Sequence, residues 1–125
     1  MLKEEIWNKW EPNSNLSNKY YVDSISDAED FVIELSDEQG NKIKLLWDCI
    51  VESYMCTDEI NRTRDYYSNK KLTKWTFFEV QNSKYIRWLH YKSIGILDIE
   101  RVKHFCIIGI NSVVDIVALD FPIIV

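Results

Sequence analysis

The sequence predicts an α+β fold, an antiparallel β-meander of about five to six strands with two or three helices packed mainly on one face. Two segments each have the pattern of a β-hairpin, residues 31–47 and residues 102–119. Helical patterns are grouped beside these hairpins and do not alternate regularly with single strands. The connections between strands are short, which favours antiparallel neighbours over parallel crossovers.

The first hairpin is predicted by two runs of alternating apolar and polar residues. Residues 31–35 and 43–47 follow this period of two, and the segment between them contains the turn-forming pair Gly40-Asn41. Alternation is typical of a strand with one face on the core and the other toward solvent. Residues 20–25 predict a further strand of this kind.

The second hairpin is predicted by residues 102–110 and 113–119, which are joined by Asn111-Ser112. Both runs are almost continuously apolar, so we expect central strands that are covered on both faces or nearly so. A two-residue turn would place Ile110 opposite Val113, and this register puts residue 104 opposite about residue 119.

Two more strands complete the predicted sheet. Residues 73–80 are dominated by aromatic and β-branched side chains, which favour strands. Residues 121–125 contain Pro122, which cannot donate a hydrogen bond inside a sheet, so we expect a short edge strand there.

Three helices are predicted. Ser83 is the expected N-cap of a helix over residues 84–92, which Gly95 ends. Thr57 is the expected N-cap of a weakly held surface helix over residues 57–69, whose first turn is acidic.

The N-terminal segment predicts the third helix. Leu2, Ile6 and Trp10 recur at helical spacing over residues 2–10, and turn-forming residues follow at 12–18. We therefore expect a single domain over residues 1–125, in which residues 1–18 form a loosely attached helix and loop.

The composition indicates an acidic globular protein of the cytoplasm. The net charge is −5 and the pI is about 5.0, which argues against general binding to nucleic acid or to anionic membranes. The first residues do not have the pattern of a signal peptide, and no run approaches the ~20 apolar residues of a membrane span. An acidic chain is compatible with a basic partner.

The motifs of common enzymes and metal sites are not found. The chain has three glycines and no glycine-rich phosphate loop, and its three cysteines show no regular spacing. His104 and Cys106 share a strand face and are the only geometrically possible His/Cys ligand pair, but two side chains in an apolar face are the better interpretation. We expect no cofactor and no metal.

His104 could act as a general base with Asp115 as its orienting carboxylate. The predicted register does not favour this pair, and no nucleophile is found nearby. Asp115 interrupts a strongly apolar run, so we expect it on a solvated face or facing a partner.

The segment over residues 57–69 combines charges with tyrosines, a composition typical of protein-recognition surfaces, although an ordinary solvated helix has it too. Exposed tryptophans are informative in the same way. The residues predicted to bind a partner are Asp58, Glu59, Arg62, Asp65, Tyr66, Glu29, Asp30 and Trp88.

Several short motifs follow one another in a particular order: Asp58-Glu59-x-x-Arg62, Phe78-x-Val80-x-Asn82-Ser83-x-Tyr85-Ile86-x-Trp88-Leu89, Ser93, Lys103-His104-Phe105, an apolar strand with Asp115, and a Phe-Pro ending. In this order they resemble small bacterial immunity proteins of polymorphic or contact-dependent toxin systems. The resemblance spans roughly residues 20–122 and rests mainly on the order of elements.

The resemblance implies a cytoplasmic, non-enzymatic protein that binds and neutralises a cognate toxin domain, as a monomer or a homodimer. If the toxin is a nuclease, surface carboxylates could stand in for the phosphates of its substrate. Two other functions remain open. One is a small ligand-binding or enzymatic domain with a cleft lined by His90 and His104. The other is a non-catalytic subunit of a larger complex that docks through the helix at residues 2–10.

Overall fold

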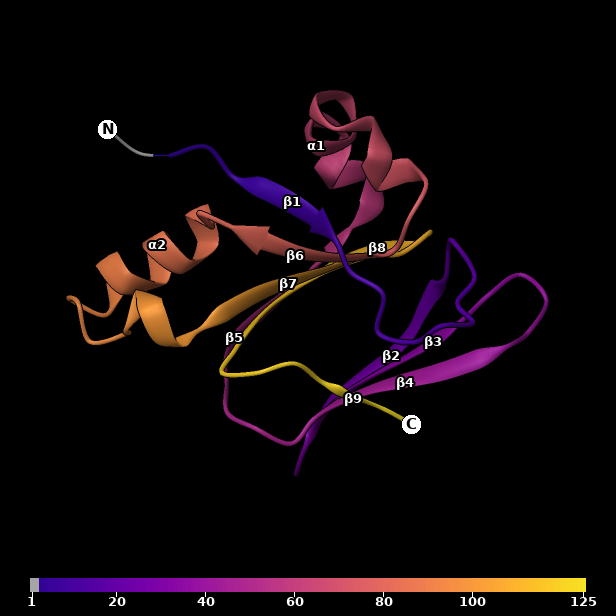
Figure 1. Ribbon diagram of the computed structural model, residues 1–125, viewed down its shortest axis with the longest axis horizontal. Coiled ribbons are helices and arrows are strands. Elements are labelled where there is room, and N and C mark those ends of the chain that lie inside the picture. The colour runs from indigo at the N-terminus through magenta and orange to yellow at the C-terminus, as the bar shows by residue number, and fades with distance from the viewer. Residues whose placement is uncertain (1–2) are drawn as a thin grey trace.

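Two antiparallel β-sheets pack face to face in the computed structural model, which describes residues 3–125 (Figure 1). One sheet has five strands in the order β1-β6-β7-β8-β5, and the other has four in the order β2-β3-β4-β9. The strands are β1 Ile6–Lys9, β2 Tyr21–Asp27, β3 Phe31–Ser36, β4 Lys42–Trp47, β5 Val51–Asp58, β6 Phe77–Gln81, β7 Lys103–Ile108, β8 Ser112–Ala118 and β9 Ile123–Ile124.

The antiparallel α+β class is confirmed, but the prediction of a single meander with five to six strands is wrong in the number of strands and sheets. The described residues form nine strands in two sheets. The helices α1, Thr63–Ser68, and α2, Lys84–Lys92, lie on the side of the five-stranded sheet that faces away from the other sheet (Figure 1). None of the helices in residues 3–125 has the length and apolar character needed to cross a membrane.

The first hairpin is confirmed as β3 and β4, in which Phe31 pairs with Trp47. Its turn is organised by Asp37, whose carboxylate accepts hydrogen bonds from the backbone of Gln39 and Asn41 and from the Ser17 hydroxyl. These bonds favour the ionised carboxylate and lower the pKa of Asp37 to about 2.

The second hairpin is confirmed as β7 and β8, and both strands are buried almost throughout. Its register differs by two residues from the prediction, because Val113 pairs with Ile108 and not with Ile110. The turn is longer than two residues: the Gly109 amide closes it on the Ser112 carbonyl, while the Ile110 amide donates to the carbonyl of Tyr20, directly before β2 of the other sheet.

The predicted N-terminal helix is wrong, because residues 6–9 form strand β1 along β6. Leu2, which contributed to the helical spacing, lies outside the described residues. Trp7 packs edge-on against Phe78, and the Trp75 indole donates to the carbonyl of Trp10. The segment is therefore held by its tryptophans and is an integral edge of the sheet.

The predicted helix over residues 57–69 is only partly correct. Strand β5 continues through Asp58, so Thr57 is a strand residue and not an N-cap. Asp58 instead caps the 3-10 helix η1, Glu59–Arg62, which leads into α1. A second 3-10 helix, η2, spans Lys70–Thr73, and β6 consequently begins at Phe77 and not at residue 73.

Helix α2 is confirmed with its predicted cap, because the Ser83 hydroxyl accepts a hydrogen bond of 3.0 Å from the Ile86 amide. Ile86 packs with Val102 and Val117, which fixes α2 on the sheet. The C-terminal strand is confirmed as β9, an edge strand beside β4.

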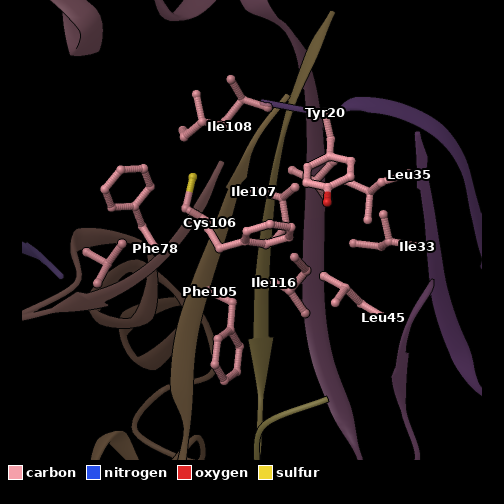
Figure 2. Close-up of a cluster of buried hydrophobic side chains, with 14 of the residues drawn as sticks. Tyr20, Ile33, Leu35, Leu45, Phe78, Phe105, Cys106, Ile107, Ile108 and Ile116 are labelled. Atoms are coloured by element: carbon pink, nitrogen blue, oxygen red, sulfur yellow. The ribbon is translucent and has the colours of Figure 1, made fainter. Parts of the chain in front are cut away.

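The core between the sheets is aromatic and aliphatic (Figure 2). Trp47 of β4 lies 5.8 Å from Phe105 of β7, measured between ring centroids. Lys19 adds a polar link: its ammonium donates to the carbonyls of Leu72, Trp75 and Ile108, and burial lowers the pKa of Lys19 to about 8.

Candidate functional site

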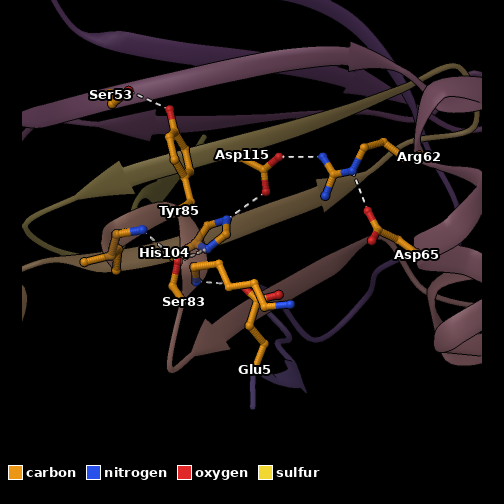
Figure 3. Close-up of polar contacts among 10 residues, drawn as sticks. Glu5, Ser53, Arg62, Asp65, Ser83, Tyr85, His104 and Asp115 are labelled. Atoms are coloured by element: carbon orange, nitrogen blue, oxygen red, sulfur yellow. Dashed lines mark hydrogen bonds and ion pairs between the residues drawn. The ribbon is translucent and has the colours of Figure 1, made fainter. Parts of the chain in front are cut away.

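A chain of four polar side chains, three of them buried and one half-buried, lies between the five-stranded sheet and its helices (Figure 3). The Ser83 hydroxyl is 2.7 Å from Nδ1 of His104, and Nε2 of His104 is 2.7 Å from Oδ1 of Asp115. Oδ2 of Asp115 accepts a hydrogen bond of 2.7 Å from the guanidinium of Arg62. We call these four residues the polar chain.

The polar chain is assembled by the register of β7 and β8. His104 pairs with Val117, so Asp115 is its diagonal neighbour on the same face of the sheet. Ser83 reaches the ring from the start of α2, where Asn82 adopts a left-handed conformation with φ 56°. Arg62 reaches Asp115 from the end of η1.

The charges of the polar chain compensate one another. Burial by itself would raise the pKa of Asp115, but the hydrogen bonds and charges of His104 and Arg62 outweigh it and hold the pKa below its usual value. Burial also works against the charged guanidinium, yet Asp115 raises the pKa of Arg62 above its ordinary range. Asp65, which accepts a hydrogen bond from Nε of Arg62, supports the same charge.

The hydrogen-bond pattern limits what the polar chain can do chemically. The two ring nitrogens of His104 are both engaged, Nε2 with the Asp115 carboxylate and Nδ1 with the Ser83 hydroxyl. Ser–His–Asp is also the set of groups found in many hydrolases. Here, however, Ser83 and His104 are only 4% and 3% exposed, and the Ser83 oxygen also accepts the Ile86 amide. This arrangement fastens α2 and η1 to the sheet.

Two sequence predictions about these residues are wrong. The His104–Asp115 pair, which the predicted register disfavoured, exists. Asp115 lies neither on a solvated face nor toward a partner, because it is only 2% exposed. A carboxylate inside an apolar run indicates a buried group that needs an ionic partner. That partner is Arg62, which lies 53 positions away in the sequence, so local pattern could not identify it.

Cys106 is directly opposite Asp115 on the neighbouring strand. Burial, and then the nearby Asp115 carboxylate, raise the pKa of the Cys106 thiol well above its usual value. The thiol therefore stays protonated, which disfavours metal binding with His104. Within residues 3–125, no group of three His, Cys, Asp or Glu side chains is placed to hold a metal ion.

The predicted partner-binding residues do not form one surface. Glu29 and Asp30 are exposed in the turn between β2 and β3 of the four-stranded sheet, whereas Trp88 is exposed on α2, beyond the five-stranded sheet. The other five lie around η1 and α1. Asp58 is exposed, Glu59 and Tyr66 are half-buried, and Arg62 and Asp65 bind each other.

The two histidines also lie in different places. His90 bonds through Nδ1 to the carbonyl of Leu97, near the C-terminal end of α2. His104 is buried on β7 beneath the start of that helix. They do not line the single cleft that the sequence suggested.

Large apolar side chains are exposed on α2 and in the loop after it, where Ile94 and Ile96 are the two most exposed in residues 3–125, while Tyr67 of α1 is also 80% exposed. Tyr91, Ile94 and Ile96 are 78%, 93% and 86% exposed, and Trp88 is 55% exposed. We call these four residues the α2 apolar surface. The sequence prediction found only Trp88, because the isoleucines lie in a loop where no periodicity marks which side chains face outward.

Ile94 is unusual in its backbone as well. Its φ is 57°, in the left-handed region that glycine and asparagine favour and that β-branched residues rarely occupy. An isoleucine here carries backbone strain and leaves its side chain in water. The amides of Ile94 and Gly95 close the end of α2 on the carbonyls of Tyr91 and His90, which accounts for this backbone conformation. The side chain remains 93% exposed, which makes this position a candidate for binding.

Comparison of the chain with models of protein families, with curated proteins and with solved structures finds no significant match. The site must therefore be interpreted from its own geometry.

Proposed function

We propose that this protein is a binding protein that neutralises a bacterial toxin domain, as the resemblance to immunity proteins suggests, and that the α2 apolar surface is its main contact. The observation that carries the proposal is the exposure of four large apolar side chains on one helix and its loop. Large apolar side chains that are exposed close together along the chain are typical of interaction sites, and Trp and Tyr are frequent hot spots.

The charge of the chain supports a role in association. The net charge of −5 favours fast encounter with a basic partner, such as the substrate cleft of a nuclease. Exposed carboxylates at Glu29, Asp30 and Asp58 lie away from α2 and would act at long range by raising the association rate. The apolar contacts would instead set the dissociation rate.

A hydrolytic role is a second candidate, favoured by the Ser83–His104–Asp115 arrangement. A depression of about 440 Å³ between α2 and the start of β7 includes Ser83 and His104 in its lining. The nearly complete burial of both side chains speaks against attack on a substrate. Activity toward simple esters that disappears in Ser83→Ala, with the fold intact, would favour this candidate.

The test of the binding role is coexpression with candidate toxin domains chosen from genes that neighbour the gene for this chain. The wild-type chain should restore growth against one of them and form a tight complex with that purified domain. Ile96→Ser should weaken both effects, whereas Ile123→Ser, an exposed isoleucine of the four-stranded sheet, serves as the matched control. Absence of any complex with the wild-type chain would overturn the proposal.

A further inference from the structure

Strand β5 forms an open edge of the five-stranded sheet. It pairs with β8 on one side, and no strand pairs with its other side in residues 3–125 (Figure 1). Its eight residues make it longer than β1, the strand at the opposite edge, which has four. A long free edge presents backbone donors and acceptors that can pair with another chain.

The direction of these backbone groups follows from the pairing. The Glu59 amide donates to Asn111, and the same register pairs Thr57 with Val113. Because alternate residues of an antiparallel strand point their amides and carbonyls in opposite directions, Tyr54 and Cys56 point theirs away from β8. The register therefore leaves the Cys56 amide without a partner on β8.

Residues 53–57 of the free edge lack the features that usually prevent pairing with other chains, whereas the strand is irregular just before them, between Val51 and Ser53. Residues 53–57, Ser-Tyr-Met-Cys-Thr, contain no charge and no proline. By contrast, β2, an edge strand of the other sheet, carries Asp23 and Asp27. Natural edges are commonly protected by charges, prolines or very short length. Tyr54 and Met55 are also exposed, at 42% and 44%, so the edge offers side-chain contacts as well.

A groove lies beside the start of β5. It has a volume of about 370 Å³, and its lining includes Ile50 and Glu52 of the β5 region, Leu89 of α2, and Ile96, Leu97 and Asp98 of the following loop. Its lining therefore belongs both to the edge strand and to the α2 apolar surface, through Ile96. We call it the Leu89 groove.

We propose that β5 accepts an extended segment of the partner protein as an added strand, and that this segment places a long side chain in the Leu89 groove. In this mode of recognition the backbone hydrogen bonds supply affinity, and pockets for alternate side chains supply specificity. The inference rests on the proposed function, because it assigns a binding mode to the same partner.

The charges of the site indicate the chemistry of the segment. Glu52 and Asp58 flank the uncharged run of β5, and Asp98 adds a carboxylate to the Leu89 groove, against one cation, Arg101. Lysine or arginine suits this setting, because the aliphatic stem can cover Leu89 and Leu97 while the charged head meets a carboxylate. The added segment is therefore a basic one.

The experiment compares Cys56→Pro with Cys56→Ser in calorimetric titrations against the toxin domain. Proline removes the outward-facing amide without removing a hydrogen bond to β8, whereas serine keeps that amide. Cys56→Pro should weaken binding by about tenfold or more, as expected for the loss of one backbone hydrogen bond and its alignment, while Cys56→Ser binds like the wild type. Thermal unfolding of both variants checks that they fold.

Hydrogen exchange on the wild-type complex gives a second measurement that needs no variant. The amides of Tyr54 and Cys56 should exchange more slowly when the toxin domain is bound. A complex that leaves both amides unprotected, or that Cys56→Pro does not weaken, overturns strand addition but leaves the proposed function standing. Absence of any complex overturns both. A homodimer of this chain that Cys56→Pro dissociates would show that a second copy, and not the partner, occupies the edge.

Discussion

His104 and Asp115 form a hydrogen bond of 2.7 Å inside the protein, although they are not directly opposed on their strands. This bond is the middle of a chain that begins at the cap of α2 and ends at η1. It joins three elements that are distant in the sequence. The consequences of this arrangement can be measured separately from those of the exposed surface.

Asp115→Asn should destabilise the fold by about 3 kcal/mol or more, because it removes the buried carboxylate and leaves the largely buried Arg62 guanidinium with only the more exposed Asp65 as an ionic partner. Urea unfolding measures the change in free energy. Glu34→Gln is the matched control, since Glu34 pairs with Lys44 where both side chains are about half exposed. That variant should cost less than about 1 kcal/mol. Equal effects of the two variants would contradict the account.

Stability should fall as the pH drops below about 4. The pKa values of Asp115 and Asp37 are lower in the folded state, so the unfolded chain takes up protons first. Their contribution is therefore present above the unfolded pKa and is lost as the pH falls through the folded pKa. Urea unfolding between pH 6 and pH 2.5, at about 0.5-unit steps, measures this decline. Asp37→Asn should reduce the dependence of the free energy of unfolding on pH. An unchanged dependence would contradict the hydrogen bonds that the Asp37 carboxylate accepts in its turn.

Ser83→Ala should destabilise the protein by about 2 kcal/mol or more, because it removes the cap of α2 and leaves Nδ1 of buried His104 without its partner. Chemical denaturation measures the loss, and exchange of the first amides of α2 locates it. Ser26→Ala, at an exposed strand position, should have almost no effect. A Ser83→Ala variant as stable as Ser26→Ala would show that the polar chain does not hold the helix.

Ile94→Gly should change stability and binding in opposite directions. Glycine accepts the left-handed conformation of residue 94 without strain, so the free energy of unfolding should rise by about 0.5–1 kcal/mol. Removal of an exposed side chain from the α2 apolar surface should weaken the complex with the proposed toxin partner. Thermal melts and calorimetric titrations of one preparation measure both. A gain in affinity would contradict a binding role for Ile94.

The parts of the fold that local pattern determines were predictable. The period of two marked β3 and β4, and Ser83 marked the start of α2, because both signals depend on near neighbours. Strand β1 was not predictable, since Ile6 and Trp10 have helical spacing and only pairing with β6 decides the conformation. The division of the strands into two sheets also depends on long-range packing, which the periodicity of apolar residues along the chain cannot indicate.

The candidate site likewise has features that local pattern determines and features that depend on long-range packing. The unusual position of Asp115 was visible in the sequence, but its register with His104 depended on a turn held open by the hydrogen bond of Ile110 to the carbonyl of Tyr20. Arg62 belongs to a polar segment and was therefore expected on the surface. Only the fold directs its side chain toward Asp115. The exposure of Ile94 and Ile96 likewise follows from the path of a loop.

The central claim is that the α2 apolar surface binds a partner while the polar chain holds the fold. Calorimetric titration of the toxin domain into Trp88→Ala tests it most directly. The dissociation constant should rise by about 30-fold or more, as for a tryptophan hot spot, while the free energy of unfolding stays unchanged. A Trp88→Ala variant that unfolds like the wild type and binds the domain equally tightly would contradict the claim.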